Sequence, residues 1–408
     1  MTPQNEMTPL PFEGLRLIEL TTGAAGPTVG KVLAEWGMEV IHAETRHRGD
    51  AHRGQDPKRW NQRPDFVKLH RGKKSFTVDM SKEKGRELVR RLIRLSDVLV
   101  ENYGLGVVER WGLDYEQVKA LKPDIIMVRV KGLGSTGPHA KDLTYGPNVG
   151  NLNGTTYLWN YPGSPVPTAE ARSQHPDFMG GVTAAYSVVL ALMHRAKTGQ
   201  GQLIDNAQIE VGASLLGPWY LEYQVNGRAP EPKGTHSFNA APYGAYRCAG
   251  KDQWCVIEVW GQAEWEPFCR VIGRPELACE GKFATHLGRV QHKAELDDLV
   301  EAWTRERDRY AVMETLQRAG IGAAAVQDVE DQFTRDVQYA ARGCLEPIHE
   351  PEMGDIVSEA IPVRHSATPG QMPGPAPLMG EHTYQICREL LQLSDEEIKA
   401  LDEEGVLY

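Results

Sequence analysis

The sequence predicts an α/β protein with a largely parallel, doubly wound sheet and a second, smaller α+β domain. Between residues 15 and 130, short apolar strands alternate with amphipathic helices, which is the order that a parallel sheet requires. Near residue 225 the chain becomes rich in proline and glycine, and two strands joined by a short turn follow. The length of 408 residues also favours two or three domains, because a single core stops growing at about 250–300 residues.

Composition and charge exclude several classes of function. The apolar fraction of 41% and the charged fraction of 25% are typical of a globular protein. The net charge of −10, with the two signs well mixed, argues against a nucleic-acid-binding surface. No uninterrupted apolar run reaches the roughly 18 residues of a membrane span. The six cysteines show no metal-ligand spacing. We therefore expect a cytoplasmic protein with free thiols, without a metal, a nucleic-acid partner or a membrane partner.

The first unit of the chain has the order strand, small-residue loop, helix, strand. Residues 15–20 (LRLIEL) form the predicted strand, and residues 21–26 (TTGAAG) form the loop. Pro27 suits the first turn of a helix that continues to Trp36. This is a mononucleotide-binding βαβ opening, although its glycines do not match G-x-G-x-x-G, which argues against a nicotinamide cofactor. The loop is also explained by close packing of a helix on a strand.

The carboxyl ends of three predicted strands lead into loops rich in glycine. These loops are TTGAAG, NYGLG (102–106) and KGLG (131–134). Because ligands of doubly wound sheets bind outside the carboxyl ends of the strands, we expect the three loops to line one cleft. The strands that follow the first unit are predicted at 38–42, 75–80, 97–101, 125–130 and 203–207, and the helices at 82–95, 178–195 and 209–224.

Two long segments, 44–72 and 135–176, show little periodicity and are expected to be irregular. The second segment ends at His175-Pro176-Asp177, directly before the most apolar helix of the chain. Asp177 lies where a helix N-cap belongs, and a capping role alone would explain it. Alternatively, it is a nucleophile that the helix dipole keeps ionised.

The second domain and the C-terminal part are predicted from shorter patterns. Strands at 244–248 and 255–260 form a hairpin, and a third strand lies at 320–326. Residues from about 339 onwards are expected to fold back onto the first domain. The helices expected in these two parts are 263–272, 293–306, 310–319, 329–334, 384–393 and 395–403.

Four stretches of the chain resemble a known family. They are GLRLIELTTGAAGPTVGKVLAEWGMEVIHAE, SFTVDM, VENYGLGVVERWGLDYEQV, and HPDFMGG followed by HRAKTGQGQ. In order and spacing they are similar to the class III CoA-transferases, the family of the formyl-CoA and carnitine CoA-transferases. The resemblance implies a Rossmann-like large domain made of residues 1–225 and 336–408, with a smaller α+β domain at 226–335. It also implies an interlocked dimer, either a homodimer or a heteromer with a related subunit.

By the same resemblance, Asp177 stands at the position of the family's catalytic aspartate. This implies that its carboxylate attacks an acyl-CoA thioester and forms a mixed anhydride, and that CoA then returns to give an aspartyl-CoA thioester. An acceptor carboxylic acid finally takes the CoA. Only a carboxyl group can exchange CoA in this way, because a serine or cysteine would give a plain ester or thioester. The CoA thioester is a substrate, and no tightly bound cofactor is expected.

The resemblance also implies a set of CoA contacts. The arginine of this set suits phosphate, because its guanidinium offers two parallel donors. Thr45 replaces an arginine that the formyl-CoA transferases carry, so Arg46 or Arg48 is expected to compensate. Gly180 and Gly181 leave helix N–H groups open for an oxyanion, or they allow close helix packing. The implied CoA contacts are Ala24, Ala25, Asn102, Tyr103, Gly104, Arg110 and Lys131.

Three questions stay open at this point. An α-methylacyl-CoA racemase would need a histidine where Lys141 stands, and His139 and His175 are out of register with that position. A non-catalytic subunit of a heteromer is a second alternative. For the acceptor, the length and overall pattern resemble the succinyl-CoA:(R)-benzylsuccinate CoA-transferases of anaerobic toluene degradation, and a carnitine or another dicarboxylate is the alternative. The aromatic residues that suggest a bulky acid are Tyr157, Trp159, Tyr161, Trp219, Tyr220 and Tyr223.

Overall fold

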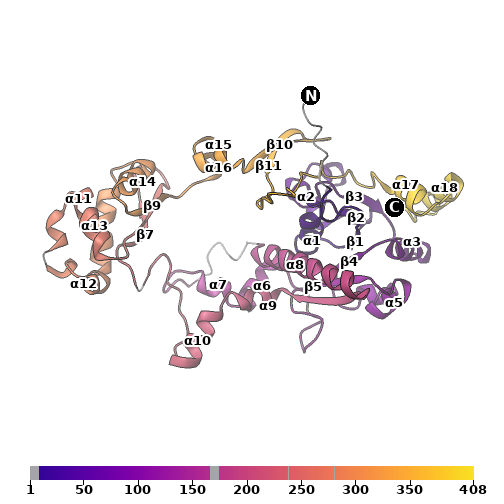
Figure 1. The fold of residues 1–408 in the computed structure, drawn as a ribbon, viewed down its shortest axis with the longest axis horizontal. Coiled ribbons are helices and arrows are strands. Elements are labelled where there is room, and N and C mark those ends of the chain that lie inside the picture. Colours follow the sequence, from indigo (N-terminus) through magenta and orange to yellow (C-terminus); the bar gives the residue numbers. More distant parts are fainter. Residues whose placement is uncertain (1–8, 166–173, 238, 280) are drawn as a thin grey trace. The chain divides into compact units, whose positions relative to one another are not determined.

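The computed structural model describes residues 9–165, 174–237, 239–279 and 281–408. The chain divides into two compact units, whose elements are labelled in Figure 1. The large unit consists of Met1–Thr156, Ala169–Ala229 and Arg342–Tyr408, and the small unit of Tyr157–Thr168 and Pro230–Ala341. Each unit is described by itself below.

The large unit is built on a six-stranded sheet in the order β3-β2-β1-β4-β5-β6, in which every pairing is parallel. Strand β1 lies between β2 and β4, with Leu17 opposite both Val40 and Val98. This is the strand order of Rossmann-like sheets, and the predicted fold class is confirmed. The direction of winding reverses between β1 and β4, where such sheets bind their ligands. The strands are β1 (Arg16–Leu20), β2 (Glu39–Glu44), β3 (Lys74–Thr77), β4 (Val98–Glu101), β5 (Ile126–Lys131) and β6 (Gln202–Ala207).

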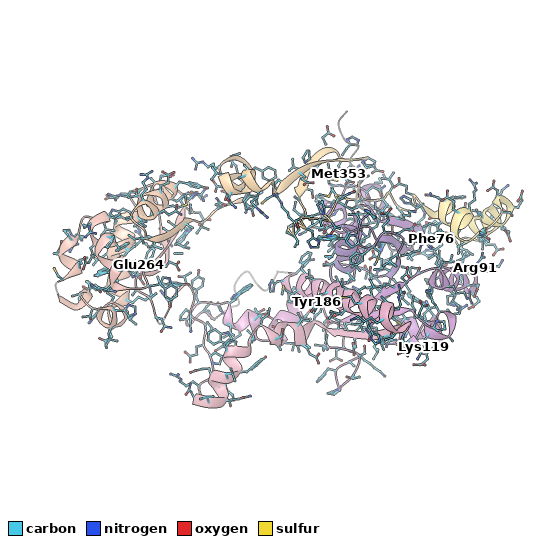
Figure 2. The ribbon with its side chains drawn as sticks, in the orientation of Figure 1. Phe76, Arg91, Lys119, Tyr186, Glu264 and Met353 are labelled. Atoms are coloured by element: carbon cyan, nitrogen blue, oxygen red, sulfur yellow. The ribbon has the colours of Figure 1, made fainter. Side chains whose placement is uncertain are left out.

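Both faces of this sheet are covered by helices, which explains why its strands are almost continuously apolar. Successive residues of a strand point to opposite faces of the sheet, so Leu17 and Ile18 belong to the hydrophobic cores on its two faces. On one face, α1 (Ala25–Ala34) packs against α8 (His175–Thr198). On the other face, α3 (Glu83–Arg94) and α5 (Tyr115–Leu121) contribute to a core that also contains Phe76 of β3 (Figure 2).

The prediction of two long irregular segments was wrong over much of their length. Residues 44–72 contain the 3-10 turns η1 (Ala51–Arg53) and η2 (Pro57–Arg59) and the helix α2 (Pro64–His70). Residues 135–165 contain α6 (Gly146–Leu152) and α7 (Thr155–Leu158), and residues 166–173 lie outside the described ranges. Each of these helices has at most two turns, too few to show a helical period in the sequence.

Two predicted helices are interrupted in the structure. The helix expected at 209–224 consists of α9 (Gln208–Ser214) and α10 (Gly217–Asn226). Pro218, which lacks a backbone N–H, marks the break because it suits the first turn of a new helix. The helix expected at 384–393 is α17 (Thr383–Gln385) followed by a π-helical turn, Ile386–Leu390. By contrast, α18 (Asp395–Glu403) has the predicted bounds and begins with a capping box.

The C-terminal part also contains an antiparallel hairpin that the sequence did not predict, β10 (Leu345–Glu350) and β11 (Gly354–Glu359). Ile348 and Ile356 are paired across the hairpin and pack against Phe66 of α2. The hairpin is anchored further by Glu350, whose carboxylate accepts from the backbone N–H of Ala376.

The small unit contains a three-stranded antiparallel sheet in the order β7-β8-β9, and the expected α+β class is confirmed. Its core is formed by the buried side chains of the sheet and of α11, including Trp265 and Phe268. The strands are β7 (Tyr243–Arg247), β8 (Trp254–Glu258) and β9 (Gly322–Ala325). The helices are α11 (Gln262–Val271), α12 (His286–Gln291), α13 (Lys293–Thr304), α14 (Arg309–Arg318), α15 (Val329–Thr334) and α16 (Val337–Arg342), the last of which ends one residue inside the large unit. Two 3-10 turns are η4 (Pro275–Ala278) and η5 (Gly281–Phe283).

Helix α8 is long and apolar enough to cross a membrane by length and composition, the one such helix within the described ranges. One side of α8 is packed in the core, where Gly181, Ala184 and Val188 are buried. A Cβ at Gly181 would lie 2.6 Å from the carbonyl oxygen of Ala25, so this glycine lets α8 and α1 approach closely. This is the packing of a core helix in a globular protein.

The opposite side of α8 carries an apolar row that we call the outward stripe. It consists of Val182, Tyr186, Leu190 and Met193, each about half exposed or more. Their spacing of three and four residues places them on one helix face, and Figure 2 shows Tyr186 on α8. An exposed apolar row of this kind is typical of a surface that another protein covers.

Candidate active site

A cleft of about 470 Å³ opens at the carboxyl ends of β1, β4 and β5. Its walls include the loop after β1 (22–25), the loop after β4 (102–105) and the loop after β5 (131–134). The expectation that three strand-end loops line one cleft is therefore confirmed. The cleft lies at the point between β1 and β4 where the sheet reverses its winding.

Asn102 links the loop after β4 to the loop after β1 through two hydrogen bonds. Its side-chain oxygen accepts from the Thr22 backbone N–H at 2.9 Å, and its side-chain N–H donates to the Thr22 carbonyl oxygen at 2.8 Å. Gly26, the second residue of α1, lies beside this bridge, and a Cβ there would lie 2.6 Å from Thr21 and 2.9 Å from Asn102. The small residues of TTGAAG are therefore explained by packing as well as by access to a ligand.

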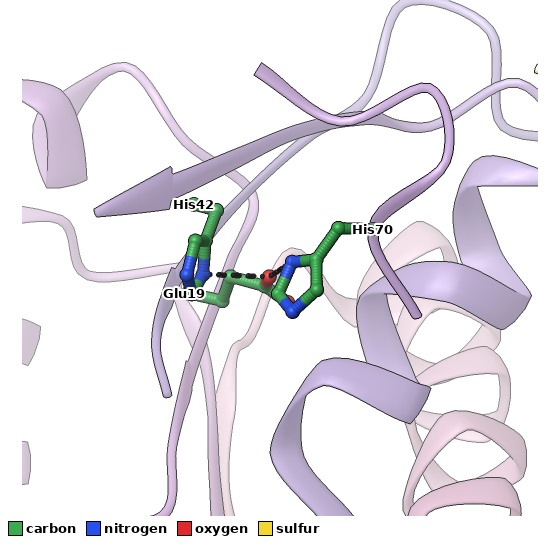
Figure 3. Close-up of side chains that lie close together, drawn as sticks. All are labelled: Glu19, His42 and His70. Carbon is green, nitrogen blue, oxygen red and sulfur yellow. Dashed lines mark ion pairs between the residues drawn. The ribbon is translucent and has the colours of Figure 1, made fainter. Parts of the chain in front are cut away.

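A network of buried charged groups lies beneath the first loop (Figure 3). One Glu19 carboxylate oxygen accepts from the Lys73 ammonium at 2.7 Å and lies 3.0 Å from Nδ1 of His42 and 3.8 Å from Nδ1 of His70. By proximity, Glu19, His42 and His70 form a candidate metal site. Lys73, however, places a positive charge on the carboxylate oxygen that a metal ion would need. The residues present therefore fit an ion-pair network better than a metal site.

The histidines of this network differ in charge. Burial alone would lower the pKa of His42, but its hydrogen bond to Glu19 and the charge of Glu44 outweigh burial and raise the pKa. Burial and the charge of Lys73 lower the pKa of His70 well below its ordinary value. His42 is thus favoured as a cation between two carboxylates, whereas His70 is neutral.

The same network supports the backbone of the cleft. Glu44 binds the Arg53 guanidinium through both oxygens at 2.8 Å, next to η1. Asp50, the N-cap of η1, accepts from the backbone N–H of His52 at 2.7 Å and from that of Gly23 at 3.1 Å. The loop after β1 is thereby held in place by charged groups that do not line the cleft.

Asp177 lies in the cleft wall, in the first turn of α8. The expectation that it is the N-cap was wrong, because α8 begins two residues earlier at His175 and Gln174 is the flanking residue. The Asp177 carboxylate instead lies in the cleft beside the side chain of Gln208 and the backbone N–H of Gly146, and both groups lower its pKa.

Burial raises the pKa of Asp177 to about 6, and the hydrogen bonds from Gln208 and Gly146 offset this only in part. The expectation that the helix dipole keeps this carboxylate ionised must therefore be corrected, since desolvation dominates. The ionised form predominates only above about pH 6. Within the described residues, no cation contributes to this shift.

The glycines around Asp177 are explained by close contacts. A Cβ at Gly146 would lie 2.4 Å from Oδ2 of Asp177, so only glycine leaves room for the carboxylate. A Cβ at Gly180 would lie 2.8 Å from Cγ of Gln208. Together with the contact of Gly181 with α1, these distances favour packing over the alternative in which the glycine pair opens helix N–H groups to an oxyanion.

Five of the predicted CoA contacts come together as expected in the first two loops of the cleft wall. They are Ala24, Ala25, Asn102, Tyr103 and Gly104. Ala24 and Ala25 are almost fully buried, so they offer backbone atoms and a close approach, whereas the loop after β4 is half-buried. Their roles toward CoA stay predictions.

The two predicted cations are placed differently. Lys131 lines the cleft, but its ammonium is bound to a Glu101 carboxylate oxygen at 2.7 Å and to the Tyr103 carbonyl oxygen. Arg110, the last residue of α4 (Val107–Arg110), is exposed and is not part of the cleft wall. Arg48 does line the cleft, whereas Arg46 donates to the Met379 carbonyl oxygen. Arg48 is therefore the better placed of the two arginines near Thr45.

Two functional candidates were missed in the sequence, Gln208 and His52. Gln208 follows β6 directly, so the rule that selected the other strand ends would also have selected it. His52 lines the cleft from η1, and its ring nitrogen Nε2 lies 3.3 Å from the side-chain nitrogen of Gln174. Its position depends on the 3-10 turn that the sequence did not predict.

The part of the expected aromatic wall that lies on α10 was wrong, because Trp219, Tyr220 and Tyr223 do not line the cleft of the large unit, whereas Tyr145 does. Tyr157, Trp159 and Tyr161 belong to the small unit, so their place in such a wall stays a prediction. His139, considered for racemase chemistry, pairs with Asp142 at 2.8 Å in an exposed position and is not part of the cleft wall.

Comparison with known proteins identifies the family. The model of CoA-transferase family III matches residues 12–383. Succinyl-CoA–D-citramalate CoA-transferase of Chloroflexus aurantiacus is 33% identical over 99% of this chain and 100% of its own. The beta subunit of succinyl-CoA–L-malate CoA-transferase from the same organism is 31% identical over 98% of this chain and 99% of its own.

Comparison with solved structures supports the same family. A crystal structure of a CAIB/BAIF family protein from Brucella suis has a TM-score of 0.86 at 31% identity and covers 94% of this chain and 100% of that one. The matched residues include all three strand-end loops and the first turn of α8, where the cleft and its carboxylate lie. The chain belongs to CoA-transferase family III and is a CoA-transferase, whose substrates are CoA thioesters and carboxylic acids.

Proposed function

We propose that this enzyme moves CoA from succinyl-CoA to a carboxylic acid and that Asp177 is its nucleophile. One observation carries the proposal: within the described residues, a carboxylate without a paired cation lies at the cleft where the three strand-end loops meet. Because none of these residues brings a positive charge to it, this carboxylate keeps its nucleophilic character once ionised. The succinyl donors in the names of the two Chloroflexus relatives support the choice of donor.

The first half of the reaction transfers the acyl group. An Asp177 oxygen attacks the thioester carbon, the new C–O bond forms as the C–S bond breaks, and CoA leaves as the thiolate. The thiolate then attacks the Asp177 carbonyl carbon of the mixed anhydride and releases succinate. The product is an aspartyl-CoA thioester.

The second half repeats these steps in reverse order with the acceptor. The acceptor carboxylate attacks the thioester carbonyl of Asp177, and the thiolate leaves again. The thiolate then attacks the acyl carbon of the new anhydride, which frees Asp177 and yields the product thioester. The attacking carboxylates are anions near neutral pH, and CoA attacks as the thiolate that it became on leaving, so these steps need no general base.

We propose that the loops after β1 and β4 bind the pantetheine chain of the CoA thioester. The buried backbone of Ala24 and Ala25 and the half-buried Asn102, Tyr103 and Gly104 support this assignment. Arg48 and Arg110 are proposed for the phosphates because both are exposed cations. Lys131 is proposed to act on CoA only through the loop that its ammonium holds. No tightly bound cofactor is proposed.

For the acceptor, we propose (R)-benzylsuccinate as the first acid to test. Benzylsuccinate is a substituted succinate and shares its dicarboxylate skeleton with the malate and citramalate named for the relatives. Leu143 and Tyr145, which line the cleft and are largely exposed, would contact the benzyl group. A carnitine and smaller dicarboxylates are the alternatives.

We further propose that the enzyme works in the cytoplasm as an interlocked dimer, either a homodimer or a heteromer with a related subunit. The outward stripe of α8 supports an assembly, because it leaves a large apolar surface exposed. The relative that acts on L-malate is named as a beta subunit, which supports a heteromer as one of the two possibilities. All six cysteines are free thiols, as expected in a reducing compartment.

The proposal is tested by exchange of labelled CoA between succinyl-CoA and a panel of acids, with purified wild type and Asp177→Ala. We expect exchange with the wild type only, and Asp177 labelled by hydroxylamine or borohydride during turnover. An Asp177→Ala variant with undiminished exchange would refute the proposal.

Two further measurements separate the alternatives. A racemase would exchange the α-hydrogen of a 2-methylacyl-CoA with deuterium from the solvent, and the CoA-transferase would not. His52→Ala is included in this assay, because His52 is the histidine that lines the cleft in the described part of the chain. A non-catalytic subunit would show no exchange alone but would restore exchange when mixed with a related chain.

A further inference from the structure

The nucleophile proposed above lies beside one side chain that the sequence analysis passed over, Gln208. It is the first residue of α9 and follows the last strand of the parallel sheet. Only 6% of its surface is exposed, and it lines the cleft together with Asp177. Its side chain interacts with the Asp177 carboxylate as a donor and lowers the pKa of that group.

The orientation of the Gln208 amide follows from its surroundings. Its Oε1 atom is buried and has no hydrogen-bond partner within the described part of the molecule. If the amide were turned over, this oxygen would face the Asp177 carboxylate and repel it. The nitrogen therefore faces Asp177, and Gln208 acts as a donor.

A glycine in α8 leaves room for the Gln208 side chain. Gly180 lies one turn after Asp177, and a Cβ there would lie 2.8 Å from Cγ of Gln208. The Gly180 carbonyl oxygen accepts from the side chain of Asn206 at 3.1 Å, which fixes β6 against the same turn of α8. The absence of a side chain at Gly180 is thus what lets Gln208 reach the carboxylate.

A second donor completes the arrangement. The backbone of Gly146 lies directly against Oδ2 of Asp177, since a Cβ on this glycine would be 2.4 Å from that oxygen, and the Gly146 N–H also lowers the pKa of Asp177. Two N–H groups from different segments therefore converge on one carboxyl group, which is the geometry of an oxyanion site.

We propose that Gln208, together with the Gly146 N–H, forms the oxyanion site for the aspartyl intermediates, an inference that rests on the proposed role of Asp177. When Asp177 is acylated, one of its oxygens bridges to the acyl group and the other becomes a carbonyl oxygen. As the CoA thiolate attacks this carbonyl carbon, the C–S bond forms and the π electrons move to the carbonyl oxygen. The two N–H groups stabilise that oxyanion until the bridging C–O bond breaks and the acid leaves as a carboxylate.

The proposal assigns Gln208 to particular steps of the cycle. Attack of Asp177 on the donor thioester places the negative charge on the acyl oxygen, which these donors do not contact. Formation and breakdown of the aspartyl-CoA thioester place the charge on the Asp177 oxygen, which they do. Loss of Gln208 should therefore slow the later steps and leave acylation by the donor almost unchanged.

The experiment compares wild type, Gln208→Ala, Gly180→Ala, the double variant and the control Glu210→Ala, an exposed residue of the same helix outside the cleft. Removal of one oxyanion donor lowers kcat by roughly 10²–10³-fold in comparable sites. We expect a loss of about this size in Gln208→Ala, with KM for succinyl-CoA nearly unchanged. Glu210→Ala should match the wild type.

Gly180→Ala provides the decisive comparison, because its methyl group would displace the Gln208 stem. It should reproduce the loss of Gln208→Ala, and the double variant should be no worse than either single variant. Additive losses, or a Gln208→Ala variant within about threefold of wild type, would overturn the proposal. Thermal melting and a Gln208→Asn variant, which keeps the amide but shortens its reach, show whether a loss comes from misfolding.

The pH profile and intermediate trapping separate this inference from the function on which it rests. Removal of the Gln208 donor should move the acid limb of kcat/KM to higher pH, because that hydrogen bond favours the ionised carboxyl group. Rapid quenching should show the acylated Asp177 accumulating in Gln208→Ala. Exchange by Asp177→Ala would refute both proposals, whereas inactive Asp177→Ala with unaffected Gln208→Ala would refute only the role of Gln208.

Discussion

Two carboxylates of the large unit, the buried Glu44 and the half-buried Asp177, allow a structural use of this group to be compared with the chemical use proposed above. Burial opposes the ionisation of Glu44, but the Arg53 guanidinium outweighs it and holds the pKa of Glu44 below its ordinary value. Among the described residues, Asp177 has only neutral donors, and burial raises its pKa to about 6. A carboxylate with a paired cation serves the fold, whereas the proposed role of Asp177 requires a carboxylate whose charge is free to attack a thioester.

The largest effect is expected from Asp177→Asn. Without the nucleophile, CoA transfer should fall by at least about 10⁴-fold, as in other enzymes that lose a covalent nucleophile. Stability should nevertheless increase at pH 8, on the order of 1–3 kcal/mol, because the buried charge is removed.

The sign of this stability change depends on pH. The pKa of Asp177 is about 6 in the folded protein and about 3.9 in an unfolded chain. Its contribution to stability is therefore fully present below about pH 4 and is lost as the pH rises through 6. The stability gain of Asp177→Asn should vanish below pH 4 in urea titrations, and an equal gain at pH 4 and pH 8 would contradict the assigned pKa.

Arg53→Met should have the opposite profile, with stability lost and the chemistry intact in whatever protein remains folded. The substitution leaves the Glu44 carboxylate buried without its cation, and breaking a buried pair in this way costs about 3–5 kcal/mol. Urea denaturation at pH 7.5 measures the loss. The exposed pair Arg318–Glu314 serves as a control, and Arg318→Met should change stability very little.

Gly146→Ala should separate the position of Asp177 from its charge. The added methyl group would lie 2.4 Å from Oδ2, so the carboxylate must move. A displacement of about 1 Å costs roughly 10²-fold in rate. We expect a loss of kcat of this order with an unchanged melting temperature. Gly217→Ala, where a Cβ meets nothing within 4 Å, is the matched control.

The smallest effects are expected from the exposed cations. Arg48→Ala should raise KM for the CoA thioester severalfold, because Arg48 lines the cleft, and kcat should change little. Arg110→Ala should have a smaller effect that disappears at high salt, since exposed charges are screened. A loss of kcat in Arg110→Ala would instead show that this residue reaches the reacting groups.

The sequence contained enough information for the sheet and for one site residue. Strands buried on both faces are continuously apolar and are followed by small residues, so β1, β4 and β5 and their loops could be located. Asp177 was selected as the candidate nucleophile only by the family resemblance, because its place between a proline and an apolar run is explained equally well by a helix cap. The helix start itself was misplaced by three residues, since His175 is helical despite the following proline.

The remaining site residues depend on contacts that no local pattern contains. Gly146 and Gln208 lie far from Asp177 along the chain, and only the fold brings their N–H groups to one carboxylate. Arg110 illustrates the converse, because a matching sequence position lies outside the cleft wall. The hairpin β10–β11 was missed because its strands mix polar residues with few apolar ones and are stabilised by α2.

The strand order has a consequence for how the enzyme is synthesised. Leu17 pairs with Val40 soon after both leave the ribosome, but its pairing with Val98 must close a much longer loop, which is slower because it costs more chain entropy. The cleft lies at this later pairing, and its last wall residue, Gln208, follows the final strand of the sheet. A nascent chain can therefore bury much of β1, β2 and β3 before its carboxylate gains the two donors. If Asp177 is the nucleophile, its complete surroundings therefore form only when the last strand of the sheet has joined.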